Sequence, residues 1–178
     1  MRRVLLFLAL LGALMATGQT QAADADRRAH FTWGAEFGSS IDLSAHDMSS
    51  IDFNANFGMR WRWFSLLGAG AGANIMVSNS CRTYPLFAVL RTSFSDGRPR
   101  LVFLDVRGGV ALNYLNDKEQ SGGYASVGVG FNLAGGKKFQ SYIMAGYTFV
   151  GRKDINDETG FQPFDNLHYA GIRLGVRF

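Results

Sequence analysis

The sequence predicts an all-β fold, an eight-stranded antiparallel up-and-down transmembrane β-barrel preceded by a cleavable signal peptide. Three observations predict it: an apolar segment near the N-terminus, eight stretches in which every second residue is apolar, and connections that alternate between short and long. A soluble sandwich also has alternating strands. The strand lengths, the connections and the aromatic residues therefore have to separate the two.

Residues 1–22 have the three parts of a secretory signal. "MRR" is basic, "VLLFLALLGALMA" is apolar, and "TQA" ends at Ala22 with small residues where a signal peptidase cleaves. The alternative, a membrane-spanning anchor, needs about 20 apolar residues. We therefore expect cleavage after Ala22, a short periplasmic segment at 23–30 and a barrel domain at 31–178.

The first four expected strands follow in order. Their apolar faces run through 31–43, 51–61, 67–77 and 84–94. The second segment is the clearest, because Asp52, Asn54 and Asn56 alternate with apolar neighbours. In the fourth, the opposite face carries Phe87 and Val89 and is nearly as apolar, so the inward face stays open there.

The last four expected strands have apolar faces through 102–114, 125–133, 139–149 and 170–178. In the sixth segment, for example, Val129 is expected to face lipid and Gly128 the lumen. A tilted strand of about ten residues is long enough to cross a bilayer. Eight such segments, each with one apolar face, favour a membrane barrel.

The connections support the same topology. Those after the second, fourth and sixth strands are short ("WFS", "SDGRP", "AGGKK"), whereas the others are longer or more polar ("SAHDMSS", "SNSCR", "NDKEQSG", "GRKDINDETGFQPFDN"). Outer-membrane barrels have short periplasmic turns and longer external loops. This asymmetry therefore predicts which end of the barrel faces the cell exterior.

Aromatic residues gather near the strand ends rather than along the strands. Trp and Tyr rings suit the boundary between water and hydrocarbon, and two such girdles mark the thickness of a membrane. The predicted girdle residues are Trp33, Trp61, Trp63, Tyr84, Tyr114, Tyr169 and Phe178.

The polar faces of the strands carry both acids and bases, which an eight-stranded barrel would bring together in its narrow interior. Because an unpaired buried charge is very costly, we expect these groups to pair. The predicted lumen network is Glu36, Asp52, Arg60, Arg62, Asp105, Arg107, Arg173 and Arg177, and Asp42 lies on the same face.

The C-terminal stretch "YAGIRLGVRF" resembles the assembly signal of bacterial outer-membrane proteins through Tyr169, Gly171, Leu174, Val176 and the terminal Phe178. With eight strands over 31–178, the chain resembles the small outer-membrane β-barrel family of OmpX-like and OmpA-transmembrane-like barrels. The resemblance implies a cell-envelope protein of the Gram-negative outer membrane. Its implied partners are the outer-membrane assembly machinery, outer-membrane lipid and lipopolysaccharide.

Composition excludes several other classes. The net charge of +4 is small and its basic residues are scattered, which argues against nucleic acid. Cys81 is the single cysteine, so an intramolecular disulfide and a thiolate metal cluster are excluded. "GAGAGAN" and "AGGKK" each lack a glycine that a nucleotide motif requires. We expect no catalytic residue, cofactor or metal site.

These observations predict a non-enzymatic barrel with a plugged lumen and a structural or surface-interaction role through its external loops, above all 151–166, toward an unidentified ligand. Phe161 and Phe164 are the aromatic residues of that loop. One alternative is a narrow, porin-like pore. The other is a lipid A acyltransferase or deacylase that would use His46 as base, near the polar loop residues Ser44, Asp47, Ser49 and Ser50.

Overall fold

A computed structural model of the chain describes residues 29–44, 48–61, 64–77, 81–93, 101–115, 118–135, 139–151 and 166–178. Its strands are β1 (His30–Asp42), β2 (Ser50–Arg60), β3 (Phe64–Met76), β4 (Arg82–Ser93), β5 (Val102–Leu115), β6 (Lys118–Gly135), β7 (Gln140–Val150) and β8 (Leu167–Arg177). Within these ranges no helix is long and apolar enough to cross a membrane. The predicted signal peptide and almost all of the segment 23–30 lie outside the described residues.

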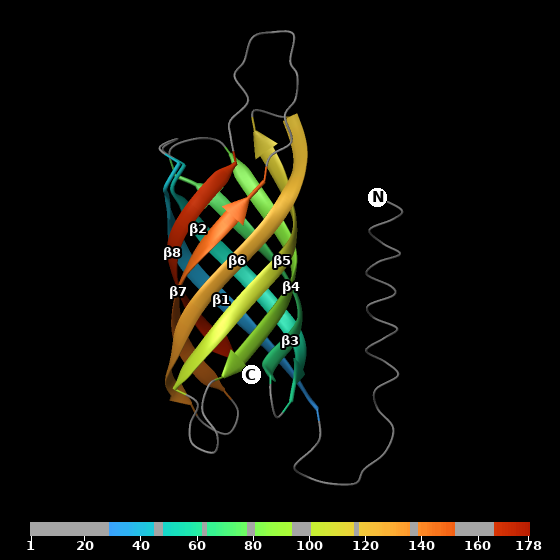
Figure 1. The fold of residues 1–178 in the computed structure, drawn as a ribbon, viewed down its shortest axis with the longest axis vertical. Coiled ribbons are helices and arrows are strands. Elements are labelled where there is room, and N and C mark those ends of the chain that lie inside the picture. The colour runs from blue at the N-terminus through green and yellow to red at the C-terminus, as the bar shows by residue number, and fades with distance from the viewer. Residues whose placement is uncertain are drawn as a thin grey trace.

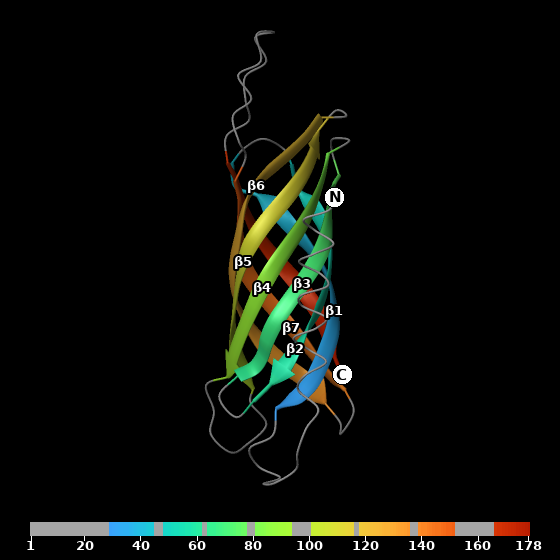
Figure 2. The ribbon, with the colours of Figure 1, turned by 90° about the vertical axis from the view of Figure 1, so that its right-hand side faces the viewer.

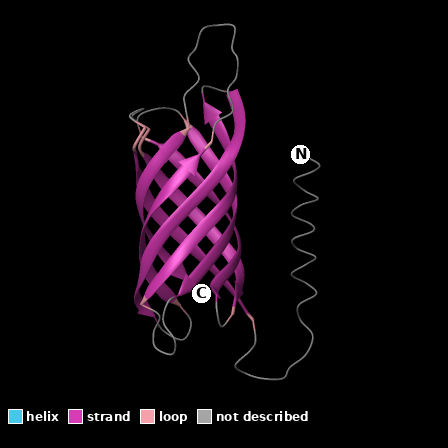
Figure 3. Cartoon of the chain, viewed as in Figure 1, coloured by secondary structure: helices cyan, strands magenta, loops and turns pink. Residues whose placement is uncertain are grey.

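The eight strands form one closed barrel in sequence order, which confirms the predicted fold class. Each strand pairs antiparallel with the next, and β8 returns to pair with β1 from Gly34↔Arg177 to Asp42↔Tyr169. Figure 1 shows the strands crossing the barrel wall diagonally, and Figure 3 shows that the wall is made of strands alone. We call the end that holds His30 and Phe178 the terminal end and the opposite end the loop end.

The C-terminal residue takes part in this closure. The Phe178 amide donates to the Trp33 carbonyl oxygen at 2.8 Å, and the Trp33 amide donates back at 3.3 Å. The Thr32 hydroxyl also donates to the Phe178 carbonyl oxygen at 2.6 Å. The Trp33 and Phe178 rings stack, with 4.5 Å between centroids. Phe178 therefore extends the pairing of β8 with β1 by one residue, at the join between the last and first strands.

The two faces of the wall differ as the sequence predicts. Large apolar side chains such as Phe37, Val129 and Leu174 are exposed on the outside. Inward positions are buried and carry polar residues, glycines and a few large rings. In β4, where the sequence left the phase open, Phe87 and Val89 are buried and Leu86 is exposed. That phase places Arg91 inside the barrel.

Glycines on the inner face make room for rings from the adjacent strand. The Phe103 ring lies over Gly130, and the Tyr142 ring lies over Gly175. A Cβ atom at either glycine would overlap the ring. These close approaches let large side chains fill a narrow interior, which is the packing that a strand glycine permits.

One predicted loop is largely strand. The sequence suggested an external loop at "NDKEQSG", but β6 begins at Lys118 and pairs with β5 as far as Leu115↔Lys118. Only residues 116–117 separate the two strands. On its other side, β6 pairs with β7 only from Tyr124 onward. The β5–β6 hairpin therefore extends past β7 at the loop end (Figure 1).

The outward phase of β6 can be tested with a charge. Val129→Arg should lower the free energy of unfolding by about 2–4 kcal/mol, because an arginine near the bilayer midplane loses its hydration. The measurement is urea unfolding of the protein refolded in lipid vesicles. Leu133→Arg, on the same face but near the end of β6, is the depth control and should cost at most about 1 kcal/mol. Equal effects at both positions would contradict the membrane position that the sequence predicts.

Candidate functional site: the charged interior of the barrel

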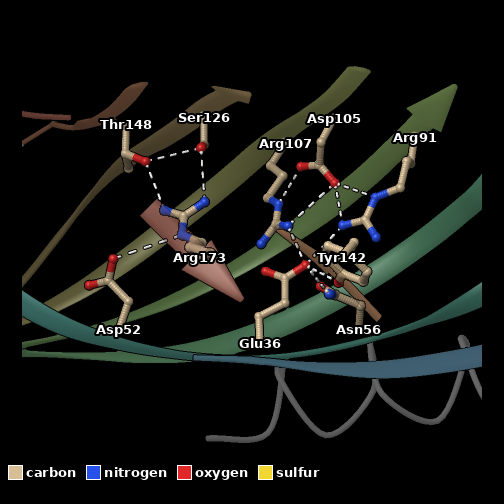
Figure 4. Close-up of polar contacts among 10 residues, drawn as sticks. All are labelled: Glu36, Asp52, Asn56, Arg91, Asp105, Arg107, Ser126, Tyr142, Thr148 and Arg173. Carbon is tan, nitrogen blue, oxygen red and sulfur yellow. Dashed lines mark hydrogen bonds and ion pairs between the residues drawn. The ribbon is translucent and has the colours of Figure 1, made fainter. Parts of the chain in front are cut away.

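The barrel interior holds a compact group of ionised side chains, which we call the Glu36 cluster. Its charged members are Glu36 from β1, Arg91 from β4, and Asp105 and Arg107 from β5; Asn56 from β2 and Tyr142 from β7 complete it. Figure 4 shows these side chains pointing toward one another. The four charged side chains are at most 1% exposed.

Glu36 is the acceptor at the centre. Its Oε1 atom accepts hydrogen bonds from Arg91 Nη2 at 2.8 Å and Arg107 Nη2 at 2.7 Å. The Tyr142 hydroxyl donates to the same oxygen at 2.7 Å, and Asn56 Nδ2 donates at 3.0 Å. The donors come from four strands, three of which are not neighbours of β1. The cluster therefore bridges the lumen instead of following the wall.

Asp105 is the second acid of the cluster, and it contacts both arginines. It accepts from Arg91 Nε at 2.8 Å and from Arg107 Nε at 2.6 Å. Two acids thus face two bases, and the cluster has no formal net charge. Buried charges persist when they are paired and hydrogen-bonded in this way.

Aromatic rings enclose the two guanidinium groups. The Arg91 guanidinium carbon lies 4.4 Å from the Tyr142 ring centroid and 4.7 Å from the Phe103 centroid. The Arg107 guanidinium lies 5.0 Å from the Phe87 centroid. Cations at these distances from a ring face are attracted to it, and the rings also exclude water.

A second polar group, the Arg173 cluster, is held mainly by hydroxyl groups. Arg173 Nη2 donates to Thr148 Oγ1 at 2.9 Å and Nη1 to Ser126 Oγ at 3.4 Å. Its Nε atom lies 3.8 Å from Asp52 Oδ2, and Asp52 in turn accepts hydrogen bonds from the Ser40 and Ser50 hydroxyls. This cluster links β1, β2, β6, β7 and β8.

The predicted lumen residues do not all meet in one cluster. Glu36, Asp105 and Arg107 meet in one cluster, and Asp52 and Arg173 in the other. Arg177 stays apart from both, where it donates to the Ser65 carbonyl oxygen at 3.1 Å and to Gln140. Asp42 accepts from the amides of Ser44 and Met48 and so holds the start of the first loop.

Two predicted placements are wrong. Arg60 has inward parity but stands at the last position of β2, where the wall ends and its side chain is exposed. It takes no part in the buried clusters. Tyr169 was predicted in the outer girdle, yet it is 1% exposed because it shares the inward face of β8 with Arg173 and Arg177.

The other girdle residues of the described strands do face outward. Trp33, Trp61 and Phe178 are about half exposed near the terminal end, and Tyr84 and Tyr114 are more than a third exposed near the loop end. Trp63 and Arg62 lie outside the described residues.

The loop considered for acyl chemistry is only partly described, because His46 and Asp47 lie outside the described residues. The Ser44 hydroxyl already forms two hydrogen bonds. It accepts from the His168 amide at 3.0 Å and donates to the Asn166 carbonyl oxygen at 3.4 Å. Ser50 is buried and donates to Asp52. Within the described ranges, no three His, Cys, Asp or Glu side chains are grouped so as to hold a metal ion.

Closed topology, an apolar exterior and a polar interior together define this protein as a barrel of the small eight-stranded outer-membrane type. No protein-family model and no curated protein matches the sequence.

Solved structures support this assignment of the fold. The crystal structure of Neisserial surface protein A matches 84% of this chain and 97% of its own, with a TM-score of 0.59 and 16% sequence identity. The N-terminal β-barrel domain of Pseudomonas aeruginosa OprF matches 85% of this chain and all of its own, with a TM-score of 0.51 and 13% identity.

The Glu36 cluster can be tested by removing one charge without changing shape. Asp105→Asn should lower the free energy of unfolding by about 3–5 kcal/mol, because Arg91 and Arg107 lose a buried charged partner. Unfolding of the refolded protein by urea measures the change. Arg60→Gln removes an exposed charge and should stay within about 0.5 kcal/mol of the wild type. An Asp105→Asn protein as stable as the wild type would show that the cluster does not stabilise the barrel.

Proposed function

We propose that this protein is an integral, non-enzymatic protein of the bacterial outer membrane, with a closed lumen and a structural or surface-interaction role at its loop end. The observation that carries the proposal is a closed barrel that is apolar outside and bridged by a neutral charge cluster inside. The fold similarity to small outer-membrane barrels supports it.

The exterior favours lipid as the surrounding solvent. Large apolar residues exposed by more than a third of their surface occur on the outward face of every described strand, and Val110, Phe131 and Ile172 are examples. Soluble monomers rarely expose contiguous apolar patches larger than a few hundred Å². Lipid would cover this surface, and the closed ladder leaves no unpaired sheet edge within the hydrocarbon.

The interior favours a plug over a pore. Glu36 is bound to Arg91 and Arg107 from the far side of the lumen, and Asp105 binds the same arginines from their own side. The rings of Phe87, Phe103 and Tyr142 lie against these guanidinium groups. Eight-stranded barrels are just wide enough for side chains to fill. These contacts support a stabilising role for the interior rather than a role in transport.

The loop end is the part of the barrel available to partners. Asp42 fixes the start of the first loop, and the β5–β6 hairpin projects at the same end. The connection 152–165, with Phe161 and Phe164, lies outside the described residues. An external ligand, lipopolysaccharide among the candidates, would contact this end.

Location is tested by fractionation. The protein should be recovered from isolated outer membranes and should change its gel mobility on heating, because a folded barrel migrates differently from its denatured chain. Recovery as a soluble periplasmic protein without heat-modifiable mobility would contradict the proposal.

The closed lumen is tested in a planar bilayer. We expect the purified wild type to give no steady conductance, because the Glu36 cluster spans the lumen. A large porin in the same bilayer serves as the positive control. A steady, ion-selective conductance of the wild type would instead establish the narrow pore.

Phe178, at the β1–β8 join, should matter for assembly. Phe178→Asp removes the stacking on Trp33 and places a charge at the barrel join, so we expect slower insertion and accumulation in the periplasm. Phe139→Asp is the matched control, since Phe139 is equally exposed, at 48%, but does not lie at the β1–β8 join. Comparison of periplasmic and outer-membrane fractions measures the effect, and equal accumulation of the two variants would argue against a special role for Phe178.

A further inference from the structure

The outward face of the barrel carries few ionisable groups other than tyrosines. Among the strand residues whose side chains the structure describes, these are Arg82 on β4, Glu119 on β6 and His168 on β8. All three lie at the loop end of their strands. Charged groups are costly on the lipid face of a barrel except near its interfaces, which fits this distribution.

Two of the three have partners within the protein. Glu119 lies beside Tyr114 in the β5–β6 ladder and interacts with its side chain. His168 is hydrogen-bonded through Nδ1 to the Tyr147 hydroxyl. Its ring also packs edge-on against the Phe149 ring, with 5.4 Å between the two centroids. By contrast, no residue of the described ranges forms an ion pair or side-chain hydrogen bond with Arg82. Arg82 is exposed, and its guanidinium donors are unoccupied within the described ranges.

The surroundings of Arg82 are amphipathic. Arg82 lies beside Tyr114 in the β4–β5 ladder, and Tyr84 packs edge-on against Tyr114 with 5.7 Å between ring centroids. Toward the middle of the barrel the next exposed pair is Leu86↔Val110, with 41% and 51% of their surfaces exposed. Figure 2 shows β4 and β5 side by side on the face toward the viewer.

We propose that Arg82, with Tyr84 and Tyr114, forms a binding site for the anionic phosphate headgroup of a membrane lipid, whose acyl chain lies over Leu86 and Val110. The guanidinium fork matches phosphate oxygens in geometry and charge. Tyrosine rings suit the headgroup level, and the exposed aliphatic pair lies where a chain would extend into the hydrocarbon. A lipid is favoured over a free phosphate because the cation and the apolar surface form one continuous strip.

This inference rests on the proposed membrane location but is tested separately from it. The full-length protein, purified in detergent, is titrated with lipid A and with phosphatidylcholine, and bound lipid is counted by native mass spectrometry. Arg82→Gln should bind lipid A about fivefold more weakly than the wild type, because one basic residue near an anionic surface contributes about 1 kcal/mol. Arg60→Gln, the matched exposed arginine at the terminal end, should bind like the wild type.

The outcomes separate the possibilities. Retention of lipid A by Arg82→Gln at wild-type strength, or equal binding of phosphatidylcholine and lipid A by the wild type, would overturn the site. Displacement of lipid A by inorganic phosphate alone, at matched phosphate concentration, would also overturn it, since the apolar strip would then contribute nothing. Unchanged heat-modifiability of Arg82→Gln excludes a folding defect. If the protein is not recovered from outer membranes but still binds lipid A in preference to phosphatidylcholine, the membrane location is rejected and the Arg82 site is retained.

Discussion

The rest of the structure depends on closure of the hydrogen-bonded ladder, in which β8 pairs antiparallel with β1 as consecutive strands pair with each other. In hydrocarbon every backbone amide and carbonyl needs an internal partner. Closure fixes the register of all eight strands, and the register decides which side chains face outward. Because side chains alternate along each strand, a slip of one residue would turn Glu36 or Arg107 outward.

Closure also creates an interior that must be filled. Glycines allow rings to lie flat against the wall, as Phe103 does over Gly130, and the rings then stack on the guanidinium groups. The four charges of the Glu36 cluster lie beside these rings as a neutral set. Polar residues inside thus take the role that a hydrophobic core has in a soluble domain, while the apolar residues face the surrounding solvent.

The sequence predicts the fold well because a period of two, repeated eight times, is compatible with few other folds. It also predicts that Glu36 and Arg107 face inward, since parity alone decides that. It does not predict which charges meet, because partners such as Glu36 and Arg107 lie far apart in the chain and depend on the stagger of the strands. Arg91 could have been predicted as a member of the cluster, because it is the only charged residue of the fourth segment, whose inward face the sequence left open. Arg60 and Lys118 show that strand ends are the hardest to place.

The convergence of four donors on the single oxygen Oε1 of Glu36 has a consequence for folding order. Those donors lie 20, 55, 71 and 106 residues further along the chain. Contacts of such sequence separation form late, because large loops must be closed first. A partly assembled sheet that lacks β7 would hold an incompletely satisfied carboxylate beside two arginines. We therefore expect assembly of the strands to be cooperative, because the barrel gains the electrostatic stability of the Glu36 cluster only when the ring of strands is nearly complete.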